Sequence, residues 1–213
     1  MEQRDLSAAL RRSYWPRLRE LGFHARTDRA AWRDASDAVD VVDIWTVGQN
    51  AIACGCTPVS VSAMVGSIPW FMPPPPAWTI KKGKARPRYP DCLLKIQLTK
   101  QLSQPWFSPF ATTAISPLAP SFAKHLDGLR SVIRLDRHDR SDIRFVKDDG
   151  SNLEEVVEDL WRATSGIGLP MLDRLHDPCA VIRLVTDAVV VSNPDSPIAH
   201  HILEAARTAC GHT

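Results

Sequence analysis

Residues 31–47 read AWRDASDAVDVVDIWTV, and this stretch decides the fold. Its second half alternates with a period of two, which places Val39, Val41, Asp43 and Trp45 on one face and Asp40, Val42, Ile44 and Thr46 on the other. Such alternation is typical of a half-buried β-strand, and residues 31–34 show it as well. The tripeptide at 35–37, Ala-Ser-Asp, predicts a turn between the two strands. The sequence therefore predicts an antiparallel hairpin.

Further strands are expected on both sides of the chain's middle. Residues 57–65 predict a third strand, with Pro58 at its start or on an edge because proline has no amide hydrogen to donate. Residues 91–99 predict another. Two more candidates, 131–135 and 142–147, flank the charged segment 136–140, which is expected to be a solvated turn.

Helices are predicted at both ends of the chain. Apolar residues recur every three or four positions between Leu6 and Leu21, and Pro16 within this pattern predicts a kink or break at Trp15-Pro16. Ser151 and Glu154 form a capping-box pattern that predicts a helix ending near Gly166. Two later helices are expected from residue 177, and from Ser196 with a buried stripe of Ile198, Ala199, Ile202, Leu203 and Ala206.

Composition agrees with an ordinary globular protein. The chain has 213 residues, 44% hydrophobic and 23% charged, with a formal net charge of +2, which excludes a disordered tail, a collagen-like repeat and a coiled coil. We therefore predict a single α+β domain over residues 1–213, in which a mainly antiparallel sheet packs against an N-terminal helix and a C-terminal helical group.

The cysteines and the apolar runs suggest a compartment. Five cysteines, at 54, 56, 92, 179 and 210, lack the regular spacing of a secreted disulfide framework, so reduced thiols and a cytoplasmic location are expected. The longest apolar runs are shorter than the roughly 18 residues that a spanning helix needs, so no membrane contact is expected.

Residues 69–120 differ from the rest and are predicted to be an insertion within the domain. They hold 11 of the 17 prolines, including the run at 73–76, which is expected to be a polyproline helix. Five cations and no acid lie in residues 81–88. Aromatic surface outside regular structure marks interaction sites, so a partner-binding role is predicted for these residues: Trp70, Phe71, Trp78, Lys81, Lys82, Lys84, Arg86, Arg88 and Trp106.

Short motifs resemble an uncharacterised family of bacterial cytoplasmic domains. The likeness rests on a leading helix that ends in Gly22-Phe23, a strand with Trp32-Arg33, and a late helix that reaches a Gly-Leu-Pro turn at 168–170. The matching stretches are roughly residues 6–66 and 153–187. The resemblance implies an intracellular α+β domain and brings no catalytic residue, because the family has no established activity.

Candidate chemical sites are few. Cys54 and Cys56, with Cys92, could offer thiolates to a soft metal, but their spacing is unlike that of zinc sites, so buried thiols and no metal are expected. His138 lies among Asp136, Asp139 and Asp142, as a general base would, although an exposed charged turn explains them better. Nucleophile and phosphate-loop motifs are absent, so no catalytic residue and no cofactor is predicted.

Three functions remain open from the sequence. The first is a non-enzymatic binding module, of the immunity or adaptor type, that covers a protein partner with the Pro/Trp-rich insertion. The second is an enzyme whose pocket between sheet and insertion uses His138 and nearby carboxylates. The third is nucleic-acid binding through residues 81–88, where clustered cations would release counterions from phosphates. The remainder of the chain carries about −3 (+2 minus +5), which disfavours the third.

Overall fold

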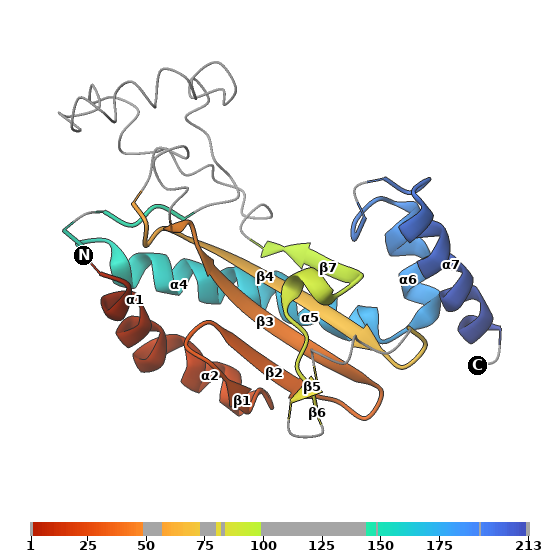
Figure 1. The fold of residues 1–213 in the computed structure, drawn as a ribbon, viewed down its shortest axis with the longest axis horizontal. Helices are drawn as coiled ribbons and strands as arrows, with labels where there is room; N and C mark the ends of the chain where they lie inside the picture. Colours follow the sequence, from red (N-terminus) through yellow and green to blue (C-terminus); the bar gives the residue numbers. More distant parts are fainter. Residues whose placement is uncertain are drawn as a thin grey trace, which may run out of the picture.

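A five-stranded antiparallel sheet forms the centre of the computed structural model, which describes residues 2–48, 57–72, 80–81, 84–98, 144–147, 149–191 and 193–211. Its strands run in the spatial order β1 (Ala25–Arg26), β2 (Ala30–Asp34), β3 (Ala38–Thr46), β4 (Val61–Pro69) and β7 (Leu94–Gln97). A separate short hairpin joins β5 (Ile80–Lys81) and β6 (Lys84–Ala85). The predicted α+β class is confirmed (Figure 1).

The predicted β2–β3 hairpin is present, and its two strands pair antiparallel. Trp32 lies opposite Val41 on one face of the hairpin, and Arg33 lies opposite Asp40 on the other. The first pair is apolar and the second is charged. At the turn, the Ala35 amide donates to the Ala38 carbonyl over 2.9 Å. One face of the sheet is the helix face, which the helices cover, and we call the other the outer face.

The other strands differ in their bounds from the prediction. β4 begins four residues later than expected, because Pro58 lies in a turn that the Ser60 amide closes on the Thr57 carbonyl. β7 is shorter than expected, since a 3₁₀ turn at Tyr89–Asp91 precedes it. Of the predicted strand at 142–147, the described part makes one bridge, from Arg144 to Val61. The candidate at 131–135 lies outside the described residues.

Of the kink or break predicted at Trp15-Pro16, the break is wrong: the helix continues past Pro16, but with an irregular turn directly before Trp15. α1 (Gln3–Ala9) runs into a π-helical turn, Leu10–Tyr14, and then into α2 (Trp15–Glu20). The Trp15 amide donates to the Leu10 carbonyl, five residues back rather than four. The wide turn before the proline accommodates the interruption of the hydrogen-bond ladder within the helix.

A second long helix also contains a π-helical turn. α4 (Leu153–Ala163) passes through Thr164–Gly168 into α5 (Leu169–Leu175), so the predicted end near Gly166 and the turn at 168–170 are both wrong. The predicted Ser151 cap is wrong too. Asn152 is the N-cap residue, and its side chain instead joins the Lys147 amide (2.9 Å) and the Phe145 carbonyl (2.8 Å).

The last two helices follow the prediction closely. The Asp177 side chain accepts the Cys179 amide at the start of α6 (Pro178–Thr186), and Ser196 accepts the Ala199 amide at the start of α7 (Pro197–Cys210). Ile198 is an exception, because it is 56% exposed instead of buried. None of the described helices is long and apolar enough to cross a membrane.

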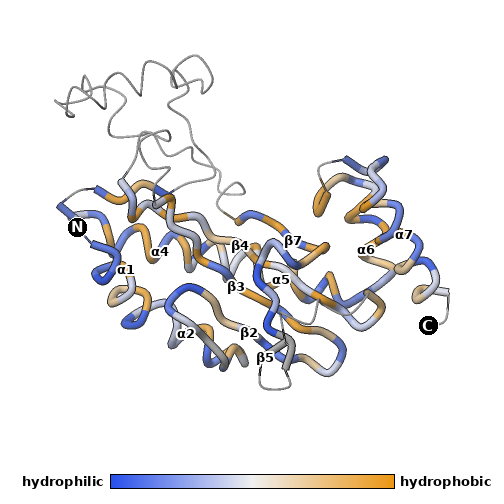
Figure 2. Tube along the Cα trace, viewed as in Figure 1, coloured by the Kyte–Doolittle hydropathy of each residue, from blue (hydrophilic) through white to orange (hydrophobic). Residues whose placement is uncertain are grey.

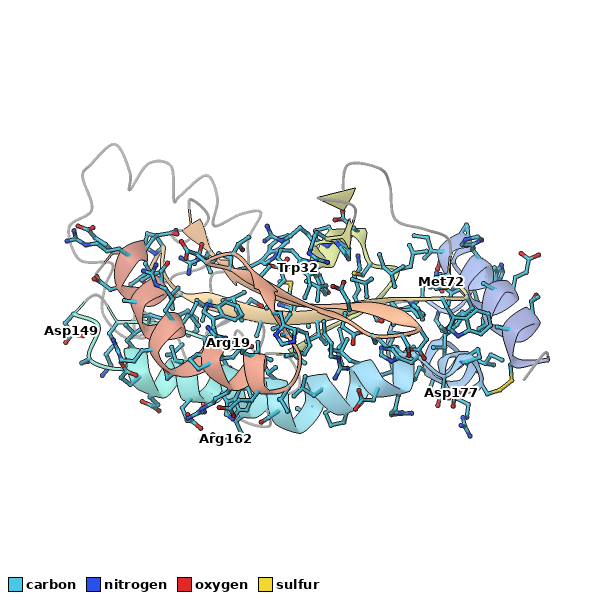
Figure 3. All side chains as sticks on the ribbon, turned by 90° about the horizontal axis from the view of Figure 1, so that it is seen from below. Arg19, Trp32, Met72, Asp149, Arg162 and Asp177 are labelled. Carbon is cyan, nitrogen blue, oxygen red and sulfur yellow. A yellow bond between two sulfur atoms is a disulfide. The ribbon has the colours of Figure 1, made fainter. Side chains whose placement is uncertain are left out.

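The main core lies between the sheet and the helices. Figure 3 shows the N-terminal helix and the α4–α5 helix on the same side of the sheet, and hydrophobic positions run along β4 and recur along the helices (Figure 2). Buried residues from the sheet and from both of these helices form one cluster that includes Leu6, Leu10, Leu18, Ile44, Val61, Val65, Leu94, Leu160 and Leu172. The outer face has a smaller cluster of Ala30, Trp32, Val41 and Cys92.

The α6–α7 pair lies at one end of the sheet (Figure 1). A disulfide joins Cys179 at the start of α6 to Cys210 at the end of α7, with 5.2 Å between the two Cα atoms. The expectation of reduced thiols is therefore wrong for this pair, because their helices bring together residues that are 31 positions apart in the sequence.

We expect Gly66→Ala to lower the free energy of unfolding by about 1–3 kcal/mol, because overpacking a filled site forces neighbours to move. A Cβ at Gly66 would lie 2.8 Å from Cys92 Cβ and 2.9 Å from its sulfur. Gly166→Ala is the control: its Cβ would meet nothing within 4 Å, so this change should be neutral or stabilise by up to about 1 kcal/mol. Urea unfolding measures the free energy of unfolding of both variants. Equal changes in the two variants would contradict the packing argument at Gly66.

Replacing both Cys179 and Cys210 with serine should lower the free energy of unfolding by about 2–4 kcal/mol, because the bond closes a long loop in the unfolded chain. Peptide mapping of protein purified without reductant should recover the two cysteines as one linked peptide pair. Alkylation of both thiols in that sample would show that the bond does not form.

Candidate functional site

Trp70 is the predicted binding residue that the structure presents most clearly. It follows directly after β4, its side chain is 55% exposed, and its ring packs edge-on against Phe71 with 5.7 Å between the centroids. The Trp70 amide donates to the Asp37 carbonyl over 2.7 Å, which ties its backbone to the tip of the β2–β3 hairpin. Phe71 is partly buried against the main core, and Met72 is buried in it. A large exposed ring is thus held on a fixed backbone.

The next group is the strap, residues 86–92, which packs on the outer face of the sheet. Its Pro87 carbonyl accepts the indole hydrogen of Trp32 over 2.7 Å. Arg86 pairs with Asp34 at 2.9 Å and lies over the Trp32 ring, 5.8 Å from the centroid. The strap therefore covers the small outer cluster and is part of the folded domain.

Arg88 makes the strongest ion pair of the strap. Its Nε and Nη2 atoms each donate to one oxygen of Asp43 over 2.8 Å, and the Tyr89 amide adds a third hydrogen bond to that carboxylate over 3.2 Å. The Asp43 side chain is fully buried. These hydrogen bonds raise the pKa of Arg88 above its ordinary value. Two of the five cations predicted to meet a partner thus have internal partners.

The other predicted binding residues divide into two groups. Lys81 and Lys84 lie on β5 and β6, in the short hairpin next to the strap. Trp78, Lys82 and Trp106 lie outside the described residues. Trp70 and Phe71 are adjacent at the end of β4, and Arg86 and Arg88 lie in the strap, so these four residues come from two different segments of the chain.

Trp45 lies on the same face of β3 as the buried Val41 but is not itself buried. Its side chain is 39% exposed on the outer face, where its ring packs edge-on against Tyr89 with 6.3 Å between the centroids. Lys95 Nζ lies 5.2 Å from the centroid of the Tyr89 ring and donates to the Pro90 carbonyl. The reason is position: Trp45 is close to the end of β3, and the strap reaches it only at Tyr89.

A polar cluster around one buried carboxylate on the helix face was not predicted. We call it the His176 cluster, and it consists of Arg33, Asp37, Asp40, Asp173 and His176. His176 Nε2 donates to Asp40 Oδ1 over 2.9 Å, and the Arg33 guanidinium donates to the other Asp40 oxygen. Asp40 is fully buried. The cluster joins β2, β3 and the end of α5.

Part of this cluster had a signal in the sequence. The predicted alternation puts Asp40 on the same face as Val42 and Ile44, and in the structure the hairpin register puts Arg33 directly opposite Asp40. His176 had no such signal, because it approaches Asp40 from 136 residues away. Only the packing of α5 against the sheet brings it there.

The described residues give little support to the predicted metal and general-base sites. Cys92 is buried, and burial raises the pKa of its thiol, so it is no ready thiolate. Cys54, Cys56, His138 and the neighbouring Asp136, Asp139 and Asp142 lie outside the described residues. Within the described ranges, no group of three or more His, Cys, Asp or Glu side chains could hold a metal ion.

We expect Arg88→Ala to lower the free energy of unfolding by about 3 kcal/mol, because it leaves the buried carboxylate of Asp43 without its counter-charge. Arg12→Ala is the control, since Arg12 and its partner Glu154 are both exposed by more than half and such pairs contribute 0 to about 1 kcal/mol. Urea unfolding measures both. A cost for Arg88→Ala no larger than that of the control would show that Asp43 is solvated without the strap.

Comparison with known proteins leaves the site to be judged on this geometry alone. No family model, no curated protein and no solved structure matches the chain. The resemblance of residues 6–66 and 153–187 to an uncharacterised bacterial family therefore stays a prediction.

Proposed function

We propose that this protein is a non-enzymatic binding module, of the immunity or adaptor type, whose contact with a protein partner is centred on Trp70. The observation that carries the proposal is the exposed indole of Trp70 on a backbone fixed by the Asp37 carbonyl. Tryptophan is enriched among the residues that dominate binding energy at protein interfaces.

The rigid support of Trp70 strengthens the proposal. Its neighbour Phe71 rests on the main core, and β4 is the strand between β3 and β7 in the sheet. A ring that is already held in place loses little freedom when a partner covers it, so more of the burial energy is available for binding.

The two other functions have weaker support. Nucleic-acid binding through residues 81–88 loses two of its five cations to Asp34 and Asp43, which leaves less charge to neutralise phosphates. An enzyme that uses His138 has no supporting contact among the described residues. A cytoplasmic location stays a prediction, and the Cys179–Cys210 disulfide would persist more readily in an oxidising compartment.

The structure also shows which variant tests this function well. Deleting residues 70–90 would be expected from the sequence to leave a folded protein, but it would remove Met72 from the core and Arg88 from Asp43. A loss of binding by that deletion would therefore report unfolding as readily as the loss of a surface. A single substitution at Trp70 keeps Met72 in the core and Arg88 on Asp43.

Trp70→Ala should reduce capture of the native partner by about tenfold or more, because truncation of a central interface tryptophan costs at least about 2 kcal/mol. The measurement is a pull-down from the native cell, quantified by mass spectrometry. Trp45→Ala is the matched control, since Trp45 is also exposed but lies on the outer face of the sheet. Equal recovery of every captured protein by wild type and Trp70→Ala would refute the proposal.

A further inference from the structure

His176 occupies a position between two carboxylates of different exposure. Its Nε2 atom lies 2.9 Å from Asp40 Oδ1, and its Nδ1 atom lies 3.6 Å from Asp37 Oδ1. Asp40 is fully buried, whereas the Asp37 side chain is 45% exposed at the hairpin tip. The imidazole therefore lies between a buried carboxylate and a half-exposed one.

Charged groups face this imidazole from each element packed around it. Asp40 comes from β3, Asp37 from the hairpin turn and Arg33 from β2, while Asp173 on α5 pairs with Arg33 at 2.9 Å. The hydrogen bond to Asp40 raises the pKa of His176 above its usual value near 6.5, against opposing effects of burial and Arg33.

The direction of this shift fixes the pH range of the effect. Because the folded pKa lies above the unfolded one, the protonated contact stabilises the fold fully below about pH 6.5 and is lost as the pH rises through the folded pKa. A neutral imidazole has one N–H, and the buried Asp40 holds that hydrogen on Nε2. The Nδ1 lone pair then faces the Asp37 carboxylate, which repels it.

The hairpin tip connects this contact to Trp70. The carboxylate of Asp37 faces His176 Nδ1, and the backbone carbonyl of Asp37 accepts a hydrogen bond from the Trp70 amide over 2.7 Å. Release of the Asp37 side chain into solvent removes the contact that joins the tip to His176, and the Trp70 amide is bonded to the backbone of that same residue.

We propose that His176 is a proton-operated latch on the Trp70 surface, which in its doubly protonated form holds the hairpin tip through Asp40 and Asp37. Loss of the Nδ1 proton frees Asp37 and loosens the backbone of Trp70. The inference concerns the regulation of the proposed binding surface and rests on that function only for its biological role. Partner binding would thus weaken as the pH rises.

Hydrogen exchange at the Trp70 amide tests the latch without a partner. In the wild type, the protection factor should fall as the pH rises from 6 to 9, because deprotonation of Nδ1 removes its ion pair with Asp37. The His176 ring should titrate by NMR with a midpoint above 6.5. An unchanged protection factor, or a midpoint at or below 6.5, would overturn the proposal.

Two carboxylate variants separate the latch from general effects of pH. Asp37→Asn removes the charge that faces Nδ1, so it should abolish the pH dependence of Trp70 protection and lower the His176 midpoint. Asp173→Asn is the control, because this exposed carboxylate contacts Arg33 and not the imidazole, and it should keep the wild-type pH dependence. The same pH dependence in wild type and Asp37→Asn would refute the latch.

The outcome is distinguishable from that of the proposed function. If exchange shows the latch but Trp70→Ala captures the same proteins as wild type, the binding function is refuted and the latch remains as a property of the fold. If Trp70→Ala loses the partner but protection is independent of pH, the latch is refuted and the binding surface remains.

Discussion

Two buried carboxylates on one strand determine how the rest of the molecule is arranged. Asp40 and Asp43 lie on opposite faces of β3, and neither side chain is exposed to solvent. Taking an ionised carboxylate out of water costs several kcal/mol unless paired groups compensate. Each face must therefore bring cations to β3. On the helix face they are Arg33 and His176, and on the outer face the cation is Arg88.

The need to pair Asp40 and Asp43 with cations fixes the positions of distant segments, which apolar packing alone would define less sharply. A strap of proline-rich sequence has few regular hydrogen bonds to hold it, yet the two bonds from Arg88 to Asp43 fix it at one register on the sheet. On the other face, the end of α5 is fixed by His176 in the same way. The surfaces next to these pairs, which carry Trp45 and Trp70, take their positions from them.

Sequence reasoning succeeded where the pattern was local. The hairpin at 31–47 follows from alternation and a turn, and α6 and α7 follow from their caps and first-position prolines, because those interactions span a few residues. It failed where the decisive partner was distant. The end of the α4 helix, the cap at Asn152 and the His176 cluster depend on neighbours that only the folded chain supplies. Of the predicted binding set, Trp70 has the exposure that its role needs, while the contacts of Arg86 and Arg88 are internal.

The Cys179–Cys210 bond also changes how the C-terminal helix pair would respond to proteolysis. Residues 179–210 form a covalent ring, and the connection between α6 and α7 is the part of that ring without helix. A protease that cuts this connection once would produce two chains that remain joined through sulfur. Under non-reducing electrophoresis the nicked protein would migrate as one molecule, and only a reductant would release a fragment that contains α7.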